Sequence, residues 1–169
     1  MTKSISARAV IALSLLACAG NFVPASPAYA ESPAPAAKAA GVLRLRSANG
    51  FDATVARLKA DVAAKGIRFF DEIDQSRLGA DAALPIGRST LILFGNPPLG
   101  VQFLQANPYA GLDWPVRMLV VEEADGSVWV AWTDFGWIAR RYAIAGKDAQ
   151  LAMARDVAAS IATAATTRE

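Results

Sequence analysis

The sequence predicts an α+β domain with two layers, a mostly antiparallel β-sheet with helices packed on one face. Three observations lead to this prediction. Strand-like and helix-like segments alternate along the first half of the domain. Two strand-like runs then flank Asp125-Gly126, a pair typical of the tight turn in an antiparallel hairpin. The chain closes on an Ala-rich segment, residues 147–164, whose apolar residues recur at helical spacing.

The predicted domain opens with a strand, a helix and a second strand. Residues 42–47 are predicted to form a half-buried strand, because leucines and arginines alternate along them. Residues 51–65 form an amphipathic helix with apolar residues four, three and four apart, and Gly66 ends it. Residues 67–73 form the second strand, with three apolar side chains predicted on one face, Ile67, Phe69 and Ile73.

Three further elements and a loop follow. A short helix is predicted over residues 75–83. Residues 89–94 are a largely apolar run, typical of a central strand covered on both faces. A helix over residues 100–107 leads into an irregular loop over residues 107–115, which two Xaa-Pro pairs bound.

The second half begins with the hairpin, whose strands are residues 116–123 and 127–133. A helix over residues 135–144 then has an apolar stripe that contains Phe135, Ile138 and Tyr142. The last helix, over residues 147–164, has four apolar residues on one face, Leu151, Ala154, Ala158 and Ile161.

The N-terminal segment has the pattern of an export signal. Lys3 and Arg8 precede an apolar run of about a dozen residues, short of the roughly 20 that a membrane-spanning helix needs. The small-x-small sequence Ala28-Tyr29-Ala30 predicts cleavage after Ala30 and a periplasmic or secreted protein. An uncleaved anchor and a lipoprotein acylated at Cys18 are the alternatives. Residues 31–41 form an Ala/Pro-rich flexible tether, and residues 42–169 form a single domain.

Composition excludes several classes of protein. The chain of 169 residues has no His and one Cys, so His-based catalysis, an intrachain disulfide and a Cys-based zinc site are all excluded. We expect no cofactor and no metal. The net charge of +2 comes from the predicted leader, and the rest has 15 Lys+Arg against 15 Asp+Glu. A neutral, exported chain argues against a nucleic-acid partner.

Several short motifs resemble one known family. The longest stretch, from Phe94 to Pro115, contains Phe94-Gly95-Asn96-Pro97, Leu99-Gly100, Leu104-Gln105-Ala106-Asn107-Pro108 and Ala110-Gly111-Leu112-Asp113. Leu119-Val120, Trp129-Val130 and Ala139-Arg140 accompany it. Residues 42–145 thereby resemble the domain-of-unknown-function family 302. The resemblance implies helices on one face of an antiparallel sheet, usually a homodimer, and no agreed reaction. The family often has His at two positions where this chain has Gln75 and Arg141 or Tyr142.

Polar residues near the irregular loop are the first candidate binding site. Gln105, Asn107, Asp113 and Arg117 are predicted to line a pocket for a small polar or anionic ligand. In the alternative, Asp113 pairs with Arg117 and the amides satisfy the loop backbone. Asn96, between a strand and a helix, either contributes to an anion site or caps the helix.

Acidic and aromatic residues supply the other candidates. Asp74, which follows Asp71 and Glu72, is a candidate binding or acid–base residue, although acids at a strand end more often lie on a solvated surface. Trp129 and Trp132 must point to opposite faces of their strand. One therefore belongs to the core, and the other is exposed, covered by the last helix or at an interface.

Three functions remain open. We favour a small-ligand-binding or interaction module that acts as a homodimer, because the residue types that most enzymes use are missing. A small-molecule isomerase or lyase that uses carboxylates and amides is the second hypothesis, and a structural envelope protein or lipoprotein is the third.

Overall fold

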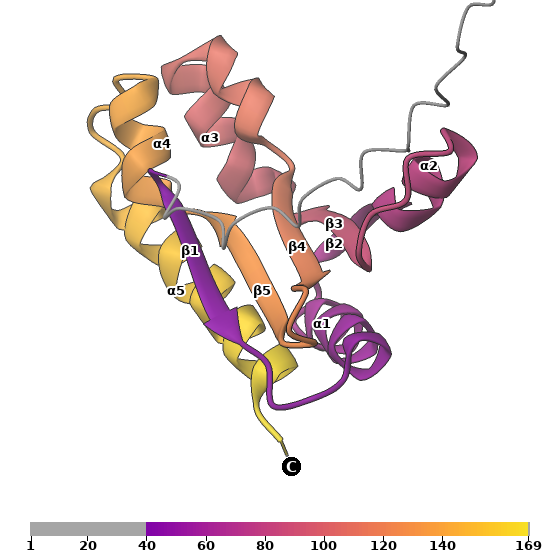
Figure 1. Cartoon of the computed structure of the whole chain (residues 1–169). Coiled ribbons are helices and arrows are strands. Elements are labelled where there is room, and N and C mark those ends of the chain that lie inside the picture. The colour runs from indigo at the N-terminus through magenta and orange to yellow at the C-terminus, as the bar shows by residue number, and fades with distance from the viewer. Residues whose placement is uncertain (1–39, 169) are drawn as a thin grey trace, which may run out of the picture. The chain divides into compact units, whose positions relative to one another are not determined.

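The computed structural model describes residues 40–168 (Figure 1). The predicted signal peptide, its cleavage after Ala30, the acylation alternative at Cys18 and most of the predicted tether lie outside the described residues. Within the described part of the chain, no helix has both the length and the apolar character needed to cross a membrane.

The described chain forms five strands, five α-helices and one 3-10 helix. The strands are β1 (Val42–Arg46), β2 (Arg68–Asp74), β3 (Ser89–Gly95), β4 (Val116–Glu122) and β5 (Val128–Thr133). The helices are α1 (Phe51–Ala64), α2 (Gln75–Asp81), α3 (Pro97–Ala106), η1 (Pro108–Asp113), α4 (Phe135–Arg141) and α5 (Asp148–Thr166). The strands make one sheet in the order β1-β5-β4-β3-β2, with every neighbouring pair antiparallel. The predicted α+β class is confirmed.

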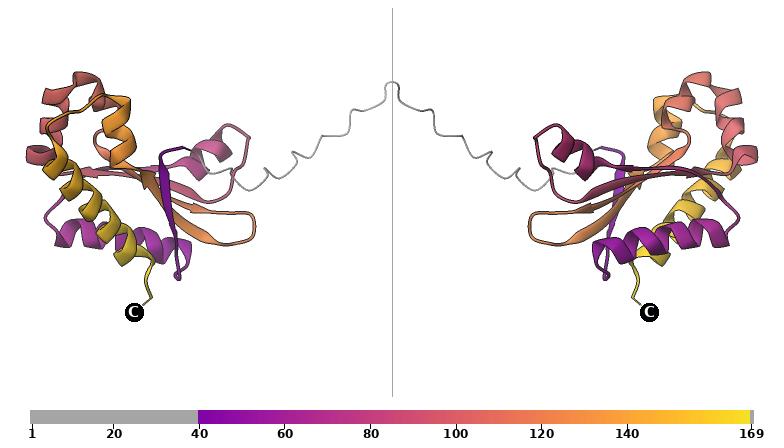
Figure 2. Two further views of the ribbon diagram at one scale, coloured as in Figure 1. Left: turned by 90° about the vertical axis from the view of Figure 1, so that its left-hand side faces the viewer. Right: turned by 90° about the vertical axis from the view of Figure 1, so that its right-hand side faces the viewer.

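Helices α1 and α5 pack against each other on one face of the sheet (Figure 2). The core lies between this helix layer and every second residue of the inner strands, including Ile92, Met118 and Val130, which are fully buried. The predicted apolar faces of α1 and α5 point into this core. All four residues predicted on the apolar face of α5 are buried, and so are Phe51, Leu58 and Val62 of α1. Helices α3, η1 and α4 lie at the end of the sheet where β3 ends and β4 begins.

Several elements differ in extent from the predictions. Helix α3 begins at Pro97 rather than residue 100, because proline fits the first helical positions, where no N–H is needed. Helix α4 stops before the predicted residue 144, since Ala143 has a left-handed backbone with φ of 48°. The predicted irregular loop contains the 3-10 helix η1, and α5 continues to Thr166.

Strand β2 contains a bulge that overturns its predicted face. Phe69 pairs with the core residue Phe94, but after the register shift Asp71 pairs with Leu93 and Ile73 with Leu91. One extra residue moves every later side chain to the opposite face of a strand. Phe69 and Ile73 therefore lie on different faces of the sheet, contrary to the prediction.

The faces of β1 and β3 also differ from the predictions. Strand β1 is exposed along its whole length rather than half-buried, because it is an edge strand. Strand β3 is internal, and its residues on the side of α1 and α5 are buried. On its other face, Ser89 is buried beside α2 and Gly95 is buried too, but Leu91 and Leu93 between them are only half-buried, so the predicted cover on both faces is incomplete in the middle of the strand.

Candidate functional site

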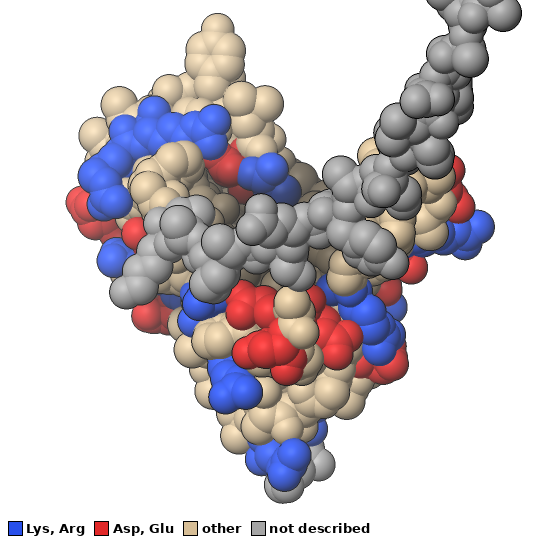
Figure 3. Space-filling view, viewed as in Figure 1, with Lys and Arg blue, Asp and Glu red and all other residues tan. Residues whose placement is uncertain are grey.

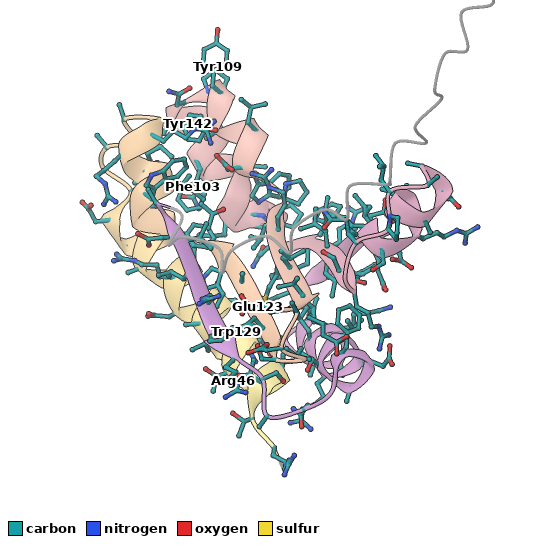
Figure 4. All side chains as sticks on the ribbon, in the orientation of Figure 1. Arg46, Phe103, Tyr109, Glu123, Trp129 and Tyr142 are labelled. Atoms are coloured by element: carbon teal, nitrogen blue, oxygen red, sulfur yellow. The ribbon has the colours of Figure 1, made fainter. Side chains whose placement is uncertain are left out.

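Two features lie together at the end of the sheet that carries α3, η1 and α4. One is a cluster of charged side chains around Asp113, and the other is an apolar cavity between α3 and α5. Figure 4 places Phe103 and Tyr142 at this end, and Arg46, Glu123 and Trp129 at the opposite end. Trp114 connects the two features, because it follows Asp113 in the chain and lines the cavity.

The carboxylate of Asp113 is buried and accepts bonds from three side chains. Arg117 donates to Oδ1, while the Tyr142 hydroxyl and the Arg141 guanidinium donate to Oδ2 at 2.6 Å and 3.2 Å. The Asp113 side chain is 3% exposed, whereas those of Arg117 and Arg141 are 42% and 45% exposed. The hydrogen bond to Asp113 raises the pKa of the Tyr142 hydroxyl, and burial adds to the rise. With both oxygens engaged, Asp113 holds η1, β4 and α4 together.

The other polar residues predicted around this loop, Asn107 and Gln105, do not bond to Asp113. The Asn107 amide donates to the Tyr142 carbonyl oxygen at 2.8 Å, and its oxygen accepts from the Tyr109 backbone N–H at 2.9 Å. Asn107 therefore caps η1 and ties it to α4. Gln105 is exposed on α3. Asp113 and Arg117 pair, as the alternative interpretation of this group proposed.

Asp74 caps α2, because its carboxylate accepts from the Arg77 backbone N–H at 3.0 Å. It also lines a shallow mixed groove between α1 and β2, where the acids Asp52 and Glu72 face Arg88 and Lys59. A group of three His, Cys, Asp or Glu side chains able to hold a metal ion is absent from the described residues.

The cavity has a volume of about 320 Å³ and a mainly apolar wall. Its aromatic and aliphatic lining comes from six elements or their ends and includes Phe94, Phe103, Trp114, Val116, Phe135 and Val157. Ala154 and Ala158 leave space on the α5 side, whereas the Trp114 ring occupies the space beside Gly95 and Gly100. Lys65, Asn96 and the half-exposed Met153 complete the lining.

Gly100 allows the Trp114 ring to lie against the first turn of α3. A Cβ at this position would stand 1.8 Å from Trp114 Nε1, well inside van der Waals contact. Gly95 sits beside the same ring, which also meets Phe70 edge to face at a centroid distance of 5.7 Å. The Leu99-Gly100 motif and the distant Trp114 are thus two halves of one packing arrangement.

Asn96 is the residue before α3, but its side chain makes no capping hydrogen bond. The helix start also offers few backbone donors. Pro97 and Pro98 have no N–H, and the N–H groups of Leu99 and Gly100 donate to the Asn96 carbonyl oxygen. The Asn96 amide is exposed at the cavity, so the side chain rather than the helix backbone is the donor here.

The sheet face opposite α1 and α5 is apolar at its centre. Its central side chains are apolar and half-buried, namely Leu91, Leu93, Leu119, Val121 and Ala131. We call this side of the sheet, with these five residues at its centre, the open face. Trp132 is buried on the helix side, whereas Trp129 lies on the open face under the Arg44 guanidinium, 4.1 Å from the ring centre. Arg44 also pairs with Glu123 at 2.7 Å, where acidic and basic side chains adjoin near the β4–β5 turn (Figure 3).

Sequence reasoning missed three contributors to these features. Arg141 and Tyr142 complete the Asp113 cluster from 28 and 29 residues away in the chain. The α5 residues that line the cavity were assigned to the core alone. The Ala154 and Ala158 pair was a usable signal, since two small residues one turn apart leave space beside a helix.

A family model and a solved structure point to the same family. The family described as "Domain of unknown function DUF302" matches residues 43–166. A crystal structure of an uncharacterised conserved DUF302 protein from Bacillus stearothermophilus has a similar fold, with a TM-score of 0.68 and 14% identity, over 75% of this chain and 99% of that one.

The curated relatives are longer proteins. The fluoride-specific ion channel FluC 1 of Brucella suis biovar 1 is 31% identical over 104 residues, which are 62% of this chain and 41% of the relative. FluC 1 of Brucella abortus and FluC 2 of Brucella melitensis match at the same identity over 38% of their length. The chain thus spans about two-fifths of the curated relatives that it matches.

Proposed function

The chain belongs to the DUF302 family, and on this premise we propose that it is an exported, non-catalytic interaction module that works as a homodimer. The open face carries this proposal. Five apolar side chains occupy the middle of a sheet whose other face already holds the domain's core. An antiparallel sheet that faces water normally presents polar residues there, and a contiguous apolar surface is typical of an interface.

The charges at the two edges of the sheet favour a second copy of the chain as the partner. Arg44 and Arg46 lie on the open face at the β1 edge, and Arg68 and Asp71 lie on it at the β2 edge. A two-fold axis parallel to the strands would place the β1 edge of each copy over the β2 edge of the other, so that Asp71 faces an edge with two arginines. The same rotation would bring the two apolar centres, around Leu119, into contact.

The neighbourhood of α2 extends the apolar surface. Leu78, Leu84 and Ile86 are 57%, 72% and 56% exposed, which is unusual for three large apolar residues in one short segment. Figure 1 shows α2 standing away from the other helices. We expect this segment to be covered in the homodimer.

The candidate acids support a non-catalytic role. Asp113 is engaged by three donors and Asp74 caps a helix, so each has a structural partner. The match to only part of longer relatives supports a domain that is used as a module.

Sedimentation equilibrium of the full-length gene product tests the proposal. We expect a dimer for the unchanged protein and a monomer for Leu119→Arg, since a charge at the centre of an apolar interface is costly. Leu112→Arg is the matched control, because Leu112 is 67% exposed on η1 and should leave the dimer intact. A monomeric unchanged protein, or a dimeric Leu119→Arg protein with a native circular dichroism spectrum, would overturn the proposal.

Export is tested separately in a Gram-negative host. We expect the protein in the periplasmic fraction with Glu31 as its first residue, determined by intact mass. Incorporation of a labelled fatty acid at Cys18 would instead favour the lipoprotein alternative.

A further inference from the structure

We propose that the cavity between α3 and α5 binds a small amphipathic monocarboxylate, with its apolar body inside and its carboxylate at the opening. This inference is independent of the homodimer, because the cavity lies on the side of the sheet that the helices cover. It goes beyond the proposed interaction function by assigning a second site and a chemical class of ligand.

The size and lining of the cavity suit the apolar body. A volume of about 320 Å³ is at the lower end of the range of small-molecule pockets, 300–1,000 Å³. It corresponds to about ten water-sized groups at roughly 30 Å³ each. The wall contains three phenylalanines, Trp114 and several aliphatic side chains, so a chain of carbon atoms fits and a fully polar ligand does not.

The polar groups at the cavity select a negatively charged acceptor. Lys65 brings an ammonium and Asn96 an amide, and none of the lining residues is acidic. The described residues include no hydrogen-bond partner for the Asn96 amide. A carboxylate oxygen is the acceptor that N–H donors and a cation favour most, since a charged acceptor roughly doubles the strength of a hydrogen bond.

The position of Lys65 is consistent with this role. Its Nζ lies 2.6 Å from both carboxylate oxygens of Asp61, one turn earlier in α1. An ammonium has three donors, so it can donate to a ligand carboxylate while it keeps its bonds to Asp61. Asp61 does not line the cavity, but its carboxylate offsets part of the Lys65 charge.

Octanoate is the probe that matches these dimensions, because it has an apolar chain, one carboxylate and about ten non-hydrogen atoms, the number estimated above. Isothermal titration calorimetry with the unchanged protein is compared with two ligands of the same chain length, 1-octanol and octylamine. We expect saturable one-to-one binding of octanoate, weaker binding of 1-octanol and the weakest binding of octylamine. Equal binding of octanoate and octylamine, or no saturable octanoate binding at millimolar concentration, would overturn the proposal.

Substitutions on α5 test whether octanoate binds in the cavity. Ala154→Leu fills the cavity and should abolish octanoate binding, whereas Ala159→Leu, on an exposed face of the same helix, should bind as the unchanged protein does. If Ala154→Leu fails to fold, Met153→Glu replaces it, since Met153 is 57% exposed and a nearby negative charge should repel the carboxylate. Unchanged octanoate affinity in a folded Ala154→Leu protein, or in Met153→Glu, would contradict the assignment.

Asn96→Ala tests the recognition of the carboxylate itself. Loss of one hydrogen bond to a charged group should weaken octanoate binding roughly tenfold and leave 1-octanol binding unchanged. Gln105→Ala is the matched control, since Gln105 is an exposed amide on α3 outside the cavity. An equal loss for octanoate in both variants, or for both ligands in Asn96→Ala, would count against a carboxylate at the opening.

Discussion

The two faces of the sheet are built from the same types of residue but are covered differently. On the helix side, Met118 and Val120 of β4 are fully buried under α1 and α5. On the open face, their neighbours Leu119 and Val121 are only half-buried. A strand that served only the core would alternate apolar with polar residues. The apolar residues of the open face therefore do not serve the core, which is why we infer a partner there.

The largest expected difference between the faces is in stability. Met118→Ala removes a fully buried side chain and should lower the free energy of unfolding by about 2–5 kcal/mol. Leu119→Ala on the open face should cost less than about 1 kcal/mol in dilute protein, where the monomer predominates. Urea unfolding of both variants measures this. Equal losses at low protein concentration would remove the distinction between the faces.

Protein concentration sharpens the same test. If the open face forms a dimer, the cost of Leu119→Ala must grow as the protein concentration rises, because association stabilises only the folded chain. The cost of Met118→Ala should stay constant.

Gly100→Ala tests how tightly the helix side is packed next to the cavity. The new Cβ would stand 1.8 Å from Trp114 Nε1, so the indole must move. We expect a loss of about 1–3 kcal/mol in urea unfolding, with a change in tryptophan emission. Gly111→Ala is the control, since its Cβ would meet only Leu104 at 3.9 Å. An unchanged tryptophan emission spectrum in Gly100→Ala would show that α3 moves and the indole does not.

Asp113→Asn tests the hydrogen-bonded cluster that holds η1, β4 and α4 together. The variant weakens the bonds from Arg117, Arg141 and Tyr142, but both arginines are about half exposed, so water replaces part of the loss. We expect a loss of about 1–2 kcal/mol in urea unfolding. Asp81→Asn breaks an exposed pair with Arg77 and should change stability by less than about 0.5 kcal/mol. Similar losses in the two variants would contradict a fastening role for Asp113.

The smallest expected effect is on the titration of Tyr142. Because its pKa is raised in the folded chain, the folded state holds the hydroxyl proton more tightly than the unfolded state does. The stability linked to this proton is fully present below about pH 10 and is lost as the pH rises from there toward the folded pKa. The difference in absorbance at the tyrosinate band between the unchanged protein and Tyr142→Phe isolates this group. In Asp113→Asn its pKa should fall toward the ordinary value, and an unchanged pKa would contradict the assigned cause.

Most of the fold follows from local patterns. The hairpin at Asp125-Gly126, the buried stripe of α5 and the opposite faces of Trp129 and Trp132 each depend on spacing within one element. The prediction for β2 failed because a bulge leaves no mark in the alternation of residues. The candidate site was predictable only in part, since Arg141 and Tyr142 reach Asp113 through tertiary packing.

By itself, the sequence determined the α+β class and the order of the elements, because these depend on periodicity and on short separations along the chain. Only the tertiary structure decided that the helices leave one apolar sheet face uncovered and that a cavity remains between α3 and α5 beside Trp114. Burial on one face or the other, and space between two helices, are properties of elements brought together, which no single segment of the chain contains.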